Sequence, residues 1–211
     1  MRYSKEHKLQ TRNRIVKNAS HSLRQKGVDG VSVADLMKLA GLTHGGFYSH
    51  FDSREALVVE SFALVIDQTA SRWLDLTKGI PAANRFDAIV KAYLSPRHRD
   101  NSGHGCALPA MGADIARSSE KVRGTFAKQL EKLIDVLACQ LSGISTEQAR
   151  QIATGAIATM MGSIVLARAS SSKKLSDDIL EAGRHAVHRQ AAVRKSRGRT
   201  IQRQRRLLAR D

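Results

Sequence analysis

The stretch SVADLMKLAGLTHGGFYSHFDSREAL, residues 32–57, decides how this chain folds. Apolar residues recur at helical spacing on both sides of an Ala-Gly-Leu step, and Ser32 and Thr43 stand where helix N-caps are expected. Two short helices joined by such a turn predict a helix-turn-helix, whose second helix enters the major groove of DNA. Gly45 and Gly46 are unexpected there, because glycine inside a helix costs about 1 kcal/mol relative to alanine.

The two glycines make sense if they remove bulk from a surface that meets DNA. The backbone can then approach base edges, and His44 is the one long polar side chain left to read them. Phe47 and Phe51 are spaced i, i+4 and are predicted to face the core. The alternative is that the glycines only relieve crowding between packed helices. The flanking side chains that suit phosphate contacts are Thr43, Tyr48, His50 and Arg54.

The whole chain is predicted to be all-α. Aromatic residues make up 4% of it and only three prolines occur among 211 residues, which disfavours a sandwich or barrel. The first helix is expected from about residue 8 to Lys26, with its apolar stripe ending before Gly27. We expect a helix-turn-helix domain over residues 8–68 (the motif itself at 32–51), a second helical domain over 69–190, and a disordered basic tail over 191–211.

Residues 32–57 strongly resemble the DNA-binding segment of the tetracycline-repressor (TetR/AcrR) family of bacterial regulators. The matching features are the capped helix, the Ala-Gly turn, the FYSHF block and the following SREAL. The resemblance implies an all-α homodimer with N-terminal domains on a near-palindromic operator and C-terminal helices for dimerisation and effector binding. It also implies which residues meet DNA. Those expected to contact phosphates are Ser32, Thr43, Tyr48, His50 and Arg54. Those expected to face the bases are His44, Gly45 and Gly46.

Positive charge is concentrated at the two ends of the chain. Residues 1–52 carry nine Lys/Arg against four Asp/Glu, residues 53–183 carry sixteen against fourteen, and residues 184–211 carry ten against one. Basic ends favour a polyanionic partner, and nucleic acid is the first candidate. The tail either adds non-specific phosphate contacts or is a solvated extension. A more distant alternative for the whole protein is an architectural protein that binds nucleic acid by charge alone.

The chain shows no sign of a metal site, a cofactor or an export signal. Its two cysteines, Cys106 and Cys139, lack metal-ligand spacing. The N-terminus has no apolar signal region, and the longest apolar run, residues 152–169, is interrupted by Gly, Ser and Thr. We therefore expect a cytoplasmic protein with no cofactor.

Cys106 supports an alternative sensing mechanism. It is expected at the start of a short helix, near Arg97, Arg99 and His104, and such surroundings lower a thiol pKa. Members of the resembled family with a similar Gly-Cys step sense electrophiles or oxidants. An inert packing role is the competing interpretation, and an enzyme with Cys106 as nucleophile lacks an orienting third group. Cys139 is expected to be buried.

The predicted function is a DNA-binding regulator, a repressor released from its operator by a small-molecule effector. Apolar residues of the second domain are candidates for the effector pocket, although apolar residues at helical spacing also build ordinary cores. The candidates for ligand binding or sensing are Cys106, Trp73, Tyr93, Met111, Phe126 and Met160.

Overall fold

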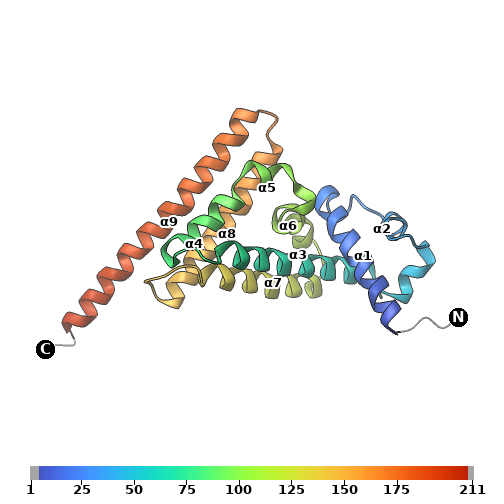
Figure 1. Cartoon of the computed structure of the whole chain (residues 1–211), viewed down its shortest axis with the longest axis horizontal. Coiled ribbons are helices and arrows are strands. Elements are labelled where there is room, and N and C mark those ends of the chain that lie inside the picture. Colours follow the sequence, from blue (N-terminus) through green and yellow to red (C-terminus); the bar gives the residue numbers. More distant parts are fainter. Residues whose placement is uncertain (1–4, 209–211) are drawn as a thin grey trace. The chain divides into compact units, whose positions relative to one another are not determined.

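The computed structural model describes the backbone of residues 5–208 and the side chains of residues 5–192. All regular structure in that range is helical, as predicted, and the range contains no strand (Figure 1). In chain order the elements are α1 (Lys5–Lys26), α2 (Val33–Leu39), η1 (His44–Ser49), α3 (Arg54–Thr77), α4 (Ala82–Tyr93), α5 (Pro96–Asp100), η2 (Ser102–His104), α6 (Leu108–Ala116), α7 (Glu120–Ala138), α8 (Thr146–Ala169) and α9 (Lys173–Leu208).

The chain divides into two compact units that interleave along the sequence. Unit 1 is Met1–Thr69 with Asn101–Leu130, and unit 2 is Ala70–Asp100 with Glu131–Asp211. The first segment of unit 1 ends at Thr69, and the expected domains over residues 8–68 and 69–190 stay predictions. The prediction does not anticipate that 101–130 packs with the N-terminal helices. The backbone of α9 is helical to Leu208; the expected disorder of residues 191–211 stays a prediction.

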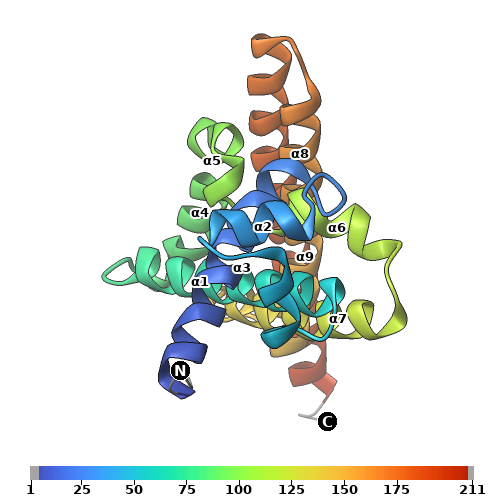
Figure 2. The same cartoon turned by 90° about the vertical axis from the view of Figure 1, so that its right-hand side faces the viewer.

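In unit 1, the segment after α5 is joined to α1 by a close backbone contact. The His21 ring Nδ1 lies 3.0 Å from the Gly103 carbonyl oxygen, and the Arg24 guanidinium donates to the Gly105 carbonyl at 3.0 Å. A Cβ on Gly103 would lie 2.5 Å from the His21 ring, so a side chain at this position would force the ring to move. This contact, together with α2 packing on α1 (Figure 2), builds unit 1 around the first helix.

The first helix follows the prediction closely. Ile15, Ala19 and Leu23 on its apolar stripe are fully buried. The helix ends at Lys26, and Gly27 follows with a φ of 77°, in the left-handed region that glycine adopts without strain.

In unit 2, α8 and α9 form an antiparallel helical hairpin (Figure 1). Ser145 begins α8 with a capping box shared with Gln148. The hairpin is tied to α5, since Arg99 donates to Asp177 of α9 at 2.6 Å and Arg168 of α8 donates to the Arg99 carbonyl at 2.9 Å. The chain before residue 100 is therefore fixed to the last two helices by charged hydrogen bonds.

One local expectation is wrong. Cys139, expected to be buried, is exposed. Leu133, Ile134, Leu137 and Ala138 form the buried side of α7, and with 3.6 residues per turn Cys139 falls on the solvent side.

Helix α8 is long and apolar enough, by length and composition alone, to cross a membrane. Its most apolar window is 44% buried in the fold. A core helix of a water-soluble protein passes the same test, so this is weak evidence of a membrane span.

His98 connects the stability of unit 2 to pH. Burial lowers the pKa of His98 to about 4, and nearby Arg168 and Arg72 act in the same direction, while the Tyr93 carbonyl 2.7 Å from Nδ1 opposes them. The unfolded chain binds this proton near pH 6.5. Stability from the neutral ring is therefore full above pH 6.5 and is lost as pH falls toward 4.

We predict that urea unfolding at fixed protein concentration will show His98 contributing at most about 3 kcal/mol of pH-dependent stability between pH 6.5 and 4. His98→Asn will be less stable at pH 7 because it loses the ring, but its unfolding free energy will fall less steeply with acid. His185→Asn, which changes an exposed histidine of α9, is the control. Parallel pH profiles for wild type and His98→Asn would contradict the assignment.

Candidate nucleic-acid interface

The second element of the motif, η1, is a 3₁₀ helix from His44 to Ser49, where the sequence pattern predicted a second short helix. The tighter winding shows in the Gly46 amide, which donates to the Thr43 carbonyl at 3.1 Å. Adjacent glycines weaken the preference for α geometry, which accounts for the difference. Ser49 closes the turn by donating its hydroxyl to the Gly46 carbonyl at 2.7 Å.

Two phenylalanines anchor η1, as predicted from their spacing. Phe47 and Phe51 are each 1% exposed, and their rings stack with centroids 5.5 Å apart. The Arg12 guanidinium lies over the Phe51 ring at 4.1 Å and forms a two-point ion pair with Glu60 of α3. Helices α1 and α3 therefore hold η1 from behind, and its other face is left to solvent.

Hydrogen bonds at both ends of α2 fix the path of the chain into η1. Ser32 and Asp35 form a capping box at the start of α2, and these bonds from Ser32 hold the pKa of Asp35 below its ordinary value. At the other end, the Leu42 amide donates to the Met37 carbonyl and Gly41 takes a φ of 70°. This is a Schellman motif, which needs a residue in the left-handed region at the Gly41 position.

The outer face of η1 has the clearance that the double glycine suggested. Gly45 is exposed, and a Cβ on it would meet nothing within 4 Å. Gly46 is half-buried, and a Cβ there would make ordinary contact with Met37 and Thr43, at 3.6 and 3.8 Å. Of the two, Gly45 therefore presents the open surface and Gly46 faces α2.

Side chains with hydrogen-bonding groups surround this opening. Tyr48 is 69% exposed, and His44 is exposed beside Gly45. Thr43 occupies the N-cap position, but its side chain makes no capping hydrogen bond, contrary to expectation, so its exposed hydroxyl is left for another acceptor or donor. Exposed basic residues lie along the neighbouring helix α1, at Lys5, Lys8, Arg14 and Lys17.

His50 lies at the edge of this surface as an uncharged ring. Burial lowers its pKa below the ordinary histidine value, and the positive charges of Lys8 and Arg12 lower it further. Its Nδ1 is buried without a hydrogen-bond partner among the described residues. At neutral pH, the His50 ring therefore carries no positive charge that could pair with a phosphate.

The Arg54 guanidinium binds groups of the protein itself. Its Nη2 donates to the Val28 and Val31 carbonyls, and Nη1 lies 3.7 Å from the Asp29 carboxylate. The Val28 amide, in turn, donates to Asp114 of α6 at 2.8 Å. The loop before α2 is thereby held between α3 and α6, a function of Arg54 that sequence spacing does not reveal.

The predicted ligand-binding and sensing residues are divided between the two units. Cys106, Met111 and Phe126 belong to unit 1, where Cys106 is 2% exposed and Phe126 packs on Phe62 with ring centroids 5.0 Å apart. The remaining three, Trp73, Tyr93 and Met160, are buried in unit 2, and the Trp73 and Tyr93 rings meet edge to face at 6.1 Å. Their grouping into one pocket stays a prediction.

No group of three or more His, Cys, Asp or Glu side chains arranged to hold a metal ion occurs among the residues that the structure describes. The described residues around η1 therefore form a surface of hydrogen-bonding side chains and exposed backbone.

Two family models match successive parts of the chain. The model described as bacterial regulatory proteins of the tetR family matches residues 15–60, and the model for the C-terminal domain of LmrA/YxaF-like transcriptional regulators matches residues 82–181. The chain belongs to the TetR family. It is a DNA-binding transcriptional regulator, and η1 is the second element of its helix-turn-helix.

Named relatives agree with the TetR assignment. The chain is 23% identical over 179 residues to the HTH-type transcriptional repressor DhaR of Mycobacterium sp. strain GP1, covering 80% of this chain and 88% of DhaR. It is 36% identical over 58 residues to the regulator TtgR of Pseudomonas putida, covering 28% of each.

Solved structures show the same fold. Reduced Escherichia coli NemR matches with a TM-score of 0.69 at 24% identity, over 84% of this chain and 95% of NemR. Bacillus subtilis FadR with stearoyl-CoA matches with a TM-score of 0.59 at 17% identity, over 81% and 96%. At these identities the likeness concerns the fold alone.

We predict that Gly45→Glu will weaken operator binding about 100-fold or more, because the new carboxylate stands on the open face of η1 and repels DNA. Fluorescence anisotropy with operator DNA measures the affinity. Since a Cβ at Gly45 meets nothing, the thermal unfolding midpoint should stay close to wild type.

The matched control is Gly124→Glu. Gly124 is also an exposed helical glycine with open space around its Cβ, but it lies on α7. Equal loss of binding in both variants would mean that net charge alone is responsible, and intact binding by Gly45→Glu would return the glycine to a packing role.

Proposed function

We propose that this TetR-family regulator is a homodimeric repressor that reads a near-palindromic operator through η1 and leaves it when a small molecule binds. The observation that carries the proposal is the open face around Gly45, framed by Thr43, His44 and Tyr48 and backed by the buried pair Phe47 and Phe51. A rigid backing and an unobstructed front are what close backbone approach to a groove requires.

We assign base readout to His44 and to the backbone at Gly45 and Gly46, and phosphate contacts to Ser32, Thr43, Tyr48 and His50. The exposed lysines and arginines of α1 add positive charge beside this surface. Arg54 is proposed to act on DNA through the loop that it holds, because its guanidinium already binds two carbonyls there. With few base-reading side chains, DNA shape contributes to selectivity.

The α8–α9 hairpin is the proposed dimer interface. Along α8, Val165 is 39% and Leu166 is 60% exposed, and Leu175 at the start of α9 is 53% exposed. Gly162 leaves open space on the same side of α8 as Val165, which lets a second helix approach closely. A second copy of this hairpin buries these apolar side chains, and a two-fold dimer matches a palindromic site.

Release by an effector is supported by the family and by one neighbour. FadR was solved with stearoyl-CoA, so a protein of this fold takes a small ligand. In the present chain, ligand binding in the C-terminal helices would shift the spacing of the two η1 elements and weaken the match to the half-sites. As a DNA-binding regulator, the protein is proposed to act in the cytoplasm, without enzymatic activity.

We predict that DNA selected from the source genome by the purified full-length protein will contain two inverted half-sites. The selected DNA should bind about 1,000-fold or more tightly than unrelated DNA at the same salt concentration. Competition with unrelated DNA measures the ratio. Equal retention of all DNA sequences would contradict operator recognition and favour an architectural protein that binds nucleic acid by charge alone.

Leu166→Glu tests the proposed dimer interface by sedimentation and by the DNA-binding assay. A buried carboxylate should prevent association, so sedimentation should give a monomer and operator affinity should fall at least about tenfold. The control Lys128→Glu introduces a carboxylate at an exposed residue of α7, outside the α8–α9 hairpin. A Leu166→Glu dimer with full affinity would exclude this interface.

Cys106 supports a second candidate function, redox or electrophile sensing. It lies just before α6, and Arg24 donates to the carbonyl of the preceding Gly105, so a helix N-terminus and a cation both lie close to the thiol. Its 2% exposure requires local opening before a reagent can reach the sulfur. Quinone would add to the thiolate, and hypochlorous acid would oxidise it.

If Cys106 is the sensor, quinone or hypochlorous acid should weaken operator binding by wild type and by Cys139→Ser, but not by Cys106→Ser. Cys139 is the matched control because it is the exposed, more accessible thiol. Equal loss in wild type and Cys106→Ser, measured by anisotropy, would exclude the sensing role and leave Cys106 as a packing residue.

A further inference from the structure

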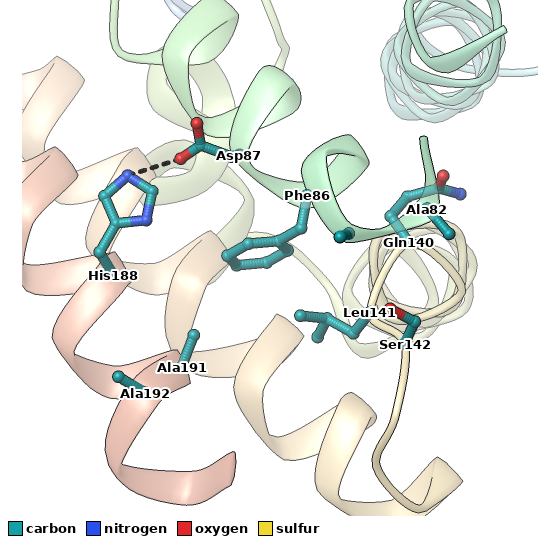
Figure 3. A pocket seen from close by; sticks show the side chains of 10 residues that line it. Ala82, Phe86, Asp87, Gln140, Leu141, Ser142, His188, Ala191 and Ala192 are labelled. Carbon is teal, nitrogen blue, oxygen red and sulfur yellow. Dashed lines mark ion pairs between the residues drawn. The ribbon is translucent and has the colours of Figure 1, made fainter. Parts of the chain in front are cut away.

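Charged side chains on the surface of unit 2 find partners within the chain. Figure 3 shows His188 of α9 pointing toward Asp87 of α4, with Nε2 and Oδ1 2.9 Å apart. The other carboxylate oxygen of Asp87 lies 3.8 Å from the Lys91 ammonium. The outer face of η1 differs, because Gly45 presents bare backbone there and a Cβ on it would meet nothing within 4 Å.

The fold itself does not require glycine at position 45. The φ of Gly45 lies outside the left-handed region, and an alanine methyl would have open space. Gly41 and Gly103 differ, since Gly41 has a φ of 70° and a Cβ on Gly103 would lie 2.5 Å from the His21 ring. Glycine inside a helix is less favourable than alanine. An advantage of glycine at position 45 therefore comes from contact outside the chain, and DNA is what this face of η1 is proposed to meet.

The side chains around Gly45 make its surroundings partly apolar. Residues i and i+3 of a 3₁₀ helix lie on the same side, so Tyr48 stands beside Gly45 on the outer face. The Tyr48 ring is 69% exposed and meets the buried Phe47 ring edge to face, with centroids 5.3 Å apart. Ser49 donates its hydroxyl to the Gly46 carbonyl at 2.7 Å. Position 45 is thus bordered by an aromatic ring and offers a base no side-chain hydrogen bond of its own.

The base that suits such a position is thymine. Of the groups that bases present in the major groove, the thymine C5-methyl is the apolar one. A donor or acceptor of any other base edge facing Gly45 would lose its water without gaining a side-chain partner. The missing side chain of Gly45 leaves the space that one methyl group needs.

We propose that a thymine C5-methyl in each operator half-site packs against the Gly45 backbone and the Tyr48 ring. This inference rests on the proposed function, because it names the base that η1 reads at one position. His44 keeps its assigned role on neighbouring base edges, and the Tyr48 hydroxyl stays available for a phosphate.

Replacing thymine by uracil removes the C5-methyl and leaves base pairing unchanged. The probe is operator DNA selected by the purified full-length protein, with each thymine replaced in turn, symmetrically in both half-sites. Fluorescence anisotropy measures the affinity at fixed salt concentration. One of these replacements should weaken binding by wild type about tenfold or more, since each half-site loses one buried methyl worth about fourfold.

The two ways in which this experiment can fail are distinct. A protein that prefers its operator over unrelated DNA but binds every uracil-containing operator as tightly would overturn the thymine contact alone. A protein that prefers no DNA sequence would overturn the proposed function together with it.

Gly45→Ala should reverse the preference for thymine. The alanine methyl occupies the place of the thymine methyl, so this variant should bind the uracil operator about fivefold or more tightly than the thymine operator. Its thermal unfolding midpoint should not fall, because the new Cβ has open space.

Gly46→Ala is the matched control on the adjacent residue. A Cβ there faces α2 and makes ordinary contact with Met37 and Thr43, at 3.6 and 3.8 Å, so this variant should keep the preference for thymine. An unchanged preference for thymine in Gly45→Ala, or a reversed preference in Gly46→Ala, would overturn the proposal.

Discussion

The stacked, buried pair Phe47 and Phe51 is the interaction on which the DNA-binding surface depends. A 3₁₀ segment of six residues with two glycines has little stability of its own, so its position is set by what it packs against. The two rings attach it to unit 1, and Arg12, paired with Glu60, covers the second ring. Because the anchoring lies on the inner side, the outer side can be bare.

The loop before α2 is likewise held by contacts on its inner side. Arg54 and Asp114 bind the backbone of the loop before α2 from two different helices. The loop leads directly into the capping box of Ser32, and α2 leads through the Gly41 turn into η1. The orientation of η1 is therefore specified by backbone hydrogen bonds at each step, while the side chains that face outward remain available for DNA.

Much of this was predictable from local rules. The capping box, the Gly41 turn and the burial of Phe47 and Phe51 all follow from short-range spacing. The 3₁₀ form of η1 was not predicted, because it depends on a balance between glycine propensity and packing. Likewise, spacing does not tell whether a guanidinium such as that of Arg54 turns outward to phosphate or inward to carbonyls. The packing of residues 101–130 with the N-terminal helices, which includes the close contact at Gly103, pairs residues far apart in sequence.

The central claim is that η1 lies against DNA, and amide hydrogen exchange with and without operator DNA measures it directly. The account predicts that operator DNA will slow exchange most strongly over residues 43–50, more than unrelated DNA of equal length does. Protection confined to the basic N-terminal and C-terminal segments, and equal for both DNAs, would contradict it.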